Sequence, residues 1–160
     1  MLSLSDPTWR RYKANYTDGA GVASLLWRAE RGEPLANWYD DLFQELCHQY
    51  TVSEAAYPAA PHLVRLANAH PDLRLDLLIL VGSCYTSAEP ARFAAIPVEV
   101  SQEWRSSAES AVTLIAAMLT EPQTDETELR YLLSSLAAVK GYPGLAMAIE
   151  RLDDIEREYS

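Results

Sequence analysis

Apolar residues recur along this chain at steps of three and four, the spacing that gathers them on one face of an α-helix. The clearest stripe lies in residues 97–119, where Trp104, Ala108, Val112 and Ile115 share a face. Comparable stripes occupy residues 7–13, 19–31, 35–48, 52–70, 72–86, 125–140 and 143–158. The pattern predicts an all-α protein of about seven or eight helices, in a single domain covering residues 1–160.

Residues that favour helix ends stand where these stripes begin and stop. Asp6, Asp18 and Asp125 can accept hydrogen bonds from the free amides of a first helical turn. Gly32 and Gly141 follow the last apolar residue of a stripe, where a left-handed backbone commonly ends a helix. These signals predict five of the helix boundaries.

The stretch from residue 42 to residue 69, LFQELCHQYTVSEAAYPAAPHLVRLANA, predicts two helices joined by a tight corner. Thr51 and Glu54 have the spacing of a capping box, which predicts that the second helix begins at residue 52. Two prolines lie inside this second helix, and we expect a kink because the apolar pattern continues past them. Its alanines allow a close approach to the first helix.

The helices are expected to form antiparallel pairs that recur at roughly 40-residue spacing, the length of HEAT and armadillo units. The expected pairs are 35–48 with 52–70, 72–86 with 97–119, and 125–140 with 143–158. Stacked pairs of this kind make an α-α superhelix. An irregular helical bundle is the competing architecture.

The composition narrows the classes of partner. The formal net charge is −10, with 13 basic residues against 23 acidic ones, which argues against a protein that wraps a nucleic-acid backbone. No signal peptide is evident at the start, and the longest apolar run, residues 77–81, is far too short for a bilayer. We therefore expect a cytoplasmic protein that binds neither nucleic acid nor membrane.

The two cysteines, Cys47 and Cys84, both lie on apolar stripes and are expected to be buried free thiols. The alternative is a redox or metal sensor, which requires the two thiols to lie within disulfide or ligand reach. Glu45 and His48 have the Glu-x-x-His spacing of di-iron sites, but no second such motif occurs. We expect no catalytic residue, no metal and no cofactor.

The candidate partner-binding residues are His48, Gln49, Tyr50, Tyr57 and Tyr39, at the ends of the two central helices. On a concave surface, the aromatic rings could anchor another protein. The alternative is structural: the histidine would cap the carbonyl end of its helix, and the tyrosines would fill the core.

The corner resembles that of small bacterial HEAT-like-repeat proteins, which carry a His-Gln-Gly-Thr-like turn followed by an alanine-rich helix with an internal proline. The matching residues are Trp38, Leu42, Leu46, His48, Gln49, Thr51, Val52, Ala55, Ala59, Pro61, Leu63, Leu66 and Ala67. Tyr50 stands where that pattern has glycine, and Ser53 where it has an aromatic residue. The resemblance implies an α-α superhelix that binds another protein without catalysis, and some such proteins are immunity proteins of bacterial toxin systems.

Charge and resemblance together predict a non-catalytic protein–protein interaction module with a basic partner, such as a toxin that an immunity protein neutralises. The alternative is a helical-repeat enzyme that acts on nucleic-acid bases, in the manner of a glycosylase. That enzyme would need a basic concave groove, which the acidity of the chain disfavours.

Overall fold

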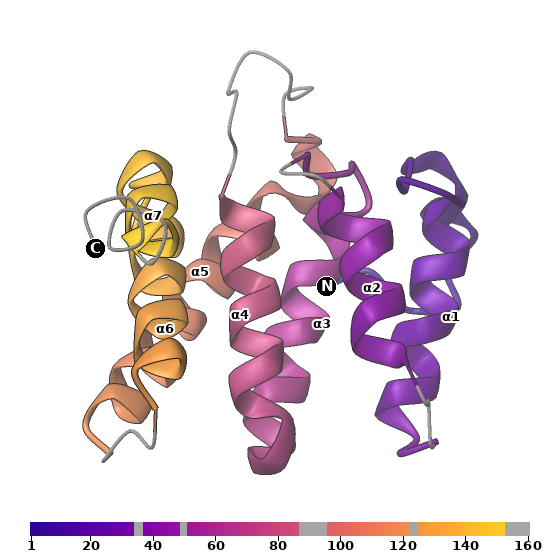
Figure 1. Cartoon of the computed structure of the whole chain (residues 1–160). Helices are drawn as coiled ribbons and strands as arrows, with labels where there is room; N and C mark the ends of the chain where they lie inside the picture. Colours follow the sequence, from indigo (N-terminus) through magenta and orange to yellow (C-terminus); the bar gives the residue numbers. More distant parts are fainter. Residues whose placement is uncertain (34–36, 49–50, 87–95, 122–124, 153–160) are drawn as a thin grey trace.

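The computed structural model describes residues 1–33, 37–48, 51–86, 96–121 and 125–152 (Figure 1). Within these ranges the chain forms seven α-helices and two short 3-10 helices, and no strand. In chain order they are η1 (Pro7–Arg11), α1 (Gly19–Glu30), α2 (Trp38–Cys47), α3 (Ala56–Ala69), η3 (Pro71–Leu73), α4 (Arg74–Tyr85), α5 (Val98–Leu119), α6 (Glu126–Val139) and α7 (Pro143–Glu150). The predicted all-α fold is confirmed.

The predicted helix ends are present at all five marked positions. The carboxylates of Asp6, Asp18 and Asp125 accept hydrogen bonds from backbone amides of η1, α1 and α6. Gly32 and Gly141 have φ angles of 65° and 85°, in the left-handed region where a side chain is unfavourable. These boundaries depend on local interactions, which explains why the sequence predicts them well.

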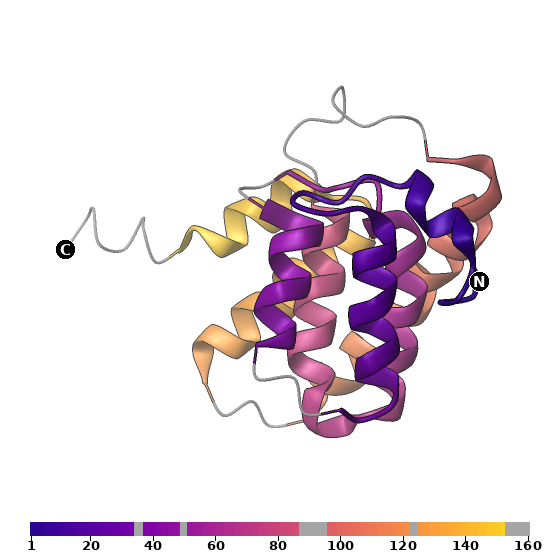
Figure 2. The same ribbon diagram turned by 90° about the vertical axis from the view of Figure 1, so that its right-hand side faces the viewer.

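The helices pack in two layers (Figures 1 and 2). Helices α1, α3 and α5 form one layer, α2, α4 and α6 form the other, and α7 packs on α6. Across the layers, α1 contacts α2, α3 contacts α4, and α5 contacts α6.

Two of the three expected helix pairs are therefore wrong. Helix α2 packs on α1 and α4 rather than on α3, and α4 packs chiefly on α3 and α6 rather than on α5. The physical reason is that α3 is apolar around much of its circumference, so it is covered by α1, α4 and α5 together. The pair α6 and α7 is found as predicted.

The predicted capping box at the start of α3 is also wrong. The Thr51 hydroxyl donates to the His48 carbonyl, and the Glu54 carboxylate accepts a hydrogen bond from the Lys13 amide at 3.2 Å. Because these side chains have other partners, the helix begins at Ala56 instead of residue 52. A segment about 40 residues away in sequence thus contacts the residue two positions before this helix.

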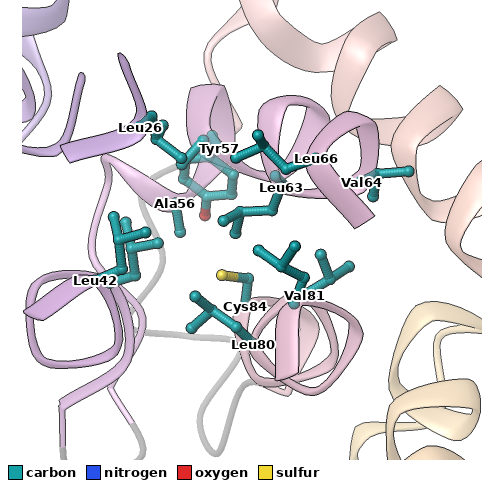
Figure 3. Packing of buried hydrophobic residues seen from close by; sticks show 14 of the residues in the cluster. Leu26, Leu42, Ala56, Tyr57, Leu63, Val64, Leu66, Leu80, Val81 and Cys84 are labelled. Carbon is teal, nitrogen blue, oxygen red and sulfur yellow. The ribbon is translucent and has the colours of Figure 1, made fainter. Parts of the chain in front are cut away.

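Helix α3 lies at the centre of the core and continues without a break past its internal proline, Pro61. Pro58 lies in the first turn, where a missing amide hydrogen leaves no intrahelical bond unmade. Leu63 points from α3 into the core toward α4, as Figure 3 shows, and Leu66 is buried as well. The buried alanines of α3 let its neighbours approach closely.

Helices α4 and α6 also approach each other closely, at Gly82. A β-carbon built on Gly82 would lie 2.5 Å from the Ser135 β-carbon and 2.7 Å from its α-carbon. Such distances require a backbone shift, because the obstructing atoms do not belong to the far end of a flexible side chain.

Gly82→Ala is therefore expected to lower the free energy of unfolding by about 1–3 kcal/mol. Gly144→Ala, in α7, is the matched control, because nothing lies within 4 Å of its added β-carbon. The control should keep or slightly raise stability, since alanine favours a helix. Urea denaturation of both variants tests this, and equal stability of the two would contradict the close packing.

Candidate functional site

The residues predicted to contact a partner do not form one cluster. Gln49 and Tyr50 lie outside the described residues. Tyr57 is buried, and its ring packs edge-on against Trp104 at 5.0 Å between ring centroids. Burial raises the pKa of Tyr57. The position of Tyr57 agrees with the alternative interpretation, in which the tyrosines fill the core.

His48 follows the last residue of α2 and is only partly buried. Its Nδ1 atom lies 2.7 Å from the Gln44 side-chain oxygen. Its ring meets that of Tyr16 edge-on, with 5.2 Å between centroids and the Tyr16 hydroxyl 3.1 Å from the ring nitrogens. His48 therefore joins α2 to the loop that precedes α1.

Tyr39, in contrast, lines a groove of about 660 Å³ that runs between α2, α4, α6 and α7. Helix α2 contributes Tyr39 and Phe43, whose rings stack with centroids 6.2 Å apart. Ile79 of α4 and Tyr131 of α6 supply further apolar surface. The groove thus has walls of aromatic and aliphatic side chains that come from helices distant in sequence.

Carboxylates surround these aromatic side chains. Asp40 and Glu150 line the groove, and none of its described lining residues is Lys or Arg. Burial, followed by the charge of Asp76, raises the pKa of Tyr39, so its hydroxyl keeps its proton as a hydrogen-bond donor. Burial and the nearby charge of Glu128 raise the pKa of Asp76. The described lining of the groove thus carries two acidic side chains and no basic one.

A basic side chain of α6 lies beside this region. The Arg130 guanidinium lies 5.7 Å from the centroid of the Tyr131 ring, within cation–π range. The exposed ring of Tyr131 can therefore be approached by a positive group.

Glu45, the first residue of the Glu-x-x-His motif, holds backbone instead of metal. Its carboxylate is buried and accepts hydrogen bonds from the amides of Tyr16 and Thr17, at 3.1 and 3.0 Å. The described residues contain no group of three or more His, Cys, Asp or Glu that could hold a metal ion. Glu45 thus fixes the loop before α1 onto the end of α2.

Glu45→Ala is expected to destabilise the fold by about 2–4 kcal/mol, because it leaves two amides without their charged acceptor. Glu45→Gln retains a side-chain oxygen and should lose less than half as much. Hydrogen exchange at the Tyr16 and Thr17 amides should quicken far more in the alanine variant. Unchanged exchange at both amides would contradict this role.

Sequence reasoning missed His62, a buried histidine of α3. Its Nε2 donates to the Leu2 carbonyl at 2.8 Å, and Arg65 lies 3.3 Å from its Nδ1 and pairs with Glu30. The spacing from Ala55 and Ala59 to residue 62 continues the buried face of α3, and this signal could have located it. The imidazole ties the N-terminal segment to the core.

Burial lowers the pKa of His62, with the Leu2 hydrogen bond acting in the opposite direction. The folded state thus prefers the neutral ring, so this ring's contribution to stability is present above about pH 6.5. It is lost as the pH falls through the lowered pKa. Stability should therefore decrease from pH 7 toward pH 5.

Urea midpoints measured from pH 8 to pH 4.5 test this expectation. His62→Gln should flatten the dependence, because glutamine does not titrate and can still donate to the Leu2 carbonyl. His70→Gln is the matched control for the loss of one histidine. An equally steep dependence in His62→Gln would assign the effect to other groups.

Cys47 and Cys84 are both buried free thiols, as predicted, and their sulfur atoms lie 3.6 Å apart. Cys47 also lines the groove. The two thiols contact each other where the C-terminal turns of α2 and α4 meet.

Fold and site together define an all-α protein with an acidic, aromatic groove on one helical layer. Comparison with protein-family models, with curated proteins and with solved structures gives no match. Across the described residues, none of the helices combines the length and apolar character needed to cross a membrane.

Proposed function

We propose that this protein is a non-catalytic interaction module that binds a basic segment of another protein in the groove between α2, α4, α6 and α7. The observation that carries the proposal is the composition of the groove. Aromatic rings and carboxylates line it, without a Lys or Arg among its described lining residues.

A lysine or arginine side chain suits both features. Its charge pairs with Asp40 and Glu150, and its head group can lie on a tyrosine face, as Arg130 does on Tyr131. Phe43 and Ile79 can cover the apolar stem of the same side chain. The net charge of −10 would also steer a basic partner toward the protein before contact.

The proposed module is an α-α superhelix that acts in the cytoplasm. The two helical layers support an α-α superhelix of HEAT-like pairs, in which stacked units leave a surface for a ligand. The two free thiols support a reducing compartment, the cytoplasm. An immunity protein that neutralises a basic toxin fits this chemistry.

The enzyme that acts on nucleic-acid bases is the less favoured function. Phosphate groups entering this groove would meet Asp40 and Glu150 instead of the cations that nucleic-acid binding requires. The acidic groove therefore supports a basic protein as the partner.

A phage-displayed peptide library provides the test, because it presents basic and acidic segments equally. We expect the selected peptides to be enriched in Lys and Arg and to bind less tightly as salt is added. Peptides without that enrichment would overturn the proposal.

The double variant Asp40→Lys/Glu150→Lys should weaken the selected peptide by about tenfold, equivalent to roughly 1.4 kcal/mol. The matched control is Asp72→Lys/Glu109→Lys, which changes the net charge equally but lies outside the groove residues. Isothermal titration calorimetry measures both, after circular dichroism has shown that each variant folds. Equal weakening by the two variants would show that overall charge, and not the groove, determines binding.

A further inference from the structure

We propose that Cys47 and Cys84 are a site of oxidative modification, where hydrogen peroxide joins the two thiols in a disulfide that links α2 to α4. The formation of this bond is independent of the proposed function. Only its effect on the groove rests on that function.

The positions of the two sulfur atoms favour the bond. They lie 3.6 Å apart, and a disulfide of about 2.05 Å requires them to approach by about 1.5 Å. Figure 3 shows the Cys84 side chain leaving α4 toward the helix that carries Leu42, which is α2. Direct packing of α2 on α4 holds the two cysteines in this arrangement.

The burial of the two thiols limits the size of the oxidant that can reach them. Cys47 and Cys84 are only 5% and 3% exposed, so a bulky disulfide such as oxidised glutathione cannot align with either sulfur. Hydrogen peroxide is small and uncharged, and Cys47 borders the groove through which it can arrive. Burial also raises the pKa of the Cys47 thiol, so little thiolate is present and the reaction with peroxide is slow.

The chemistry balances in two steps. The Cys47 sulfur attacks one peroxide oxygen and the O–O bond breaks, which gives a sulfenic acid and one water. The Cys84 sulfur then attacks the Cys47 sulfur; the S–S bond forms, the S–O bond breaks, and the hydroxyl leaves as water with the Cys84 proton. Two thiols are oxidised and one peroxide is reduced to two waters.

The bond would fix the last turn of α2 to α4 and close a loop that contains all of α3. Closing a loop of this length restricts the unfolded chain and so favours the folded state. Because Cys47 lines the groove, the same bond would also fix one of its walls.

Intact mass spectrometry of the whole protein after peroxide treatment and thiol blocking is the test. We expect both thiols to be lost together, a mass lower by about 2 Da, and a linked peptide containing Cys47 and Cys84. The thermal midpoint should rise and return to its original value when dithiothreitol is added. Oxidised glutathione should leave both thiols free.

Two single variants separate the roles of the cysteines. Cys84→Ala should accumulate a sulfenic acid at Cys47, which dimedone traps once the protein is unfolded in urea, whereas Cys47→Ala should react far more slowly. Retention of both thiols in peroxide-treated wild type, or a gain of about 32 Da at Cys47 without a linked peptide, would overturn the proposal. These wild-type results decide the matter even where a variant fails to fold.

Discussion

Helix α3 is the element on which the rest of the structure depends, because it is covered from several directions at once. Helices α1, α4 and α5 all pack on it, so the two layers meet along its length. Ala59, Ala60 and Ala67 are buried there, and their small side chains leave room for neighbouring helices to approach. A larger side chain at any of these positions would crowd the tightly packed core around α3.

Polar side chains fix the irregular segments around this apolar core. The Glu45 carboxylate accepts hydrogen bonds from two amides of the loop before α1, and His62 donates a hydrogen bond to the carbonyl of Leu2. Both side chains are buried, so breaking either contact would leave a buried polar side chain without that partner. An exposed hydrogen bond from the Lys13 amide to the Glu54 carboxylate also joins the segment before α1 to the segment before α3.

The sequence predicts features that depend on interactions between neighbouring residues, and it fails for features that depend on contacts between distant segments. Asp18 and Gly141 act within one helical turn, so the sequence identifies them directly. Helix pairing depends on contacts between distant segments, and the true partners of α2 and α4 were missed for that reason. The sequence marks Tyr39 as a candidate but does not predict the groove, because Tyr131 and Glu150 reach it from helices about 90 to 110 residues away.

Helix α2 contributes to the core, the groove and the thiol pair, because one of its faces is buried and another lines the groove. Leu42 and Leu46 are one turn apart and fully buried, whereas Asp40, Phe43 and Cys47 follow steps of three and four along the groove side. Residues so spaced share one face of the helix, so the sulfur lies on the same stripe as the groove side chains. A change at Cys47 would therefore affect both the groove and the core, because this side chain lines the groove and also belongs to the buried core.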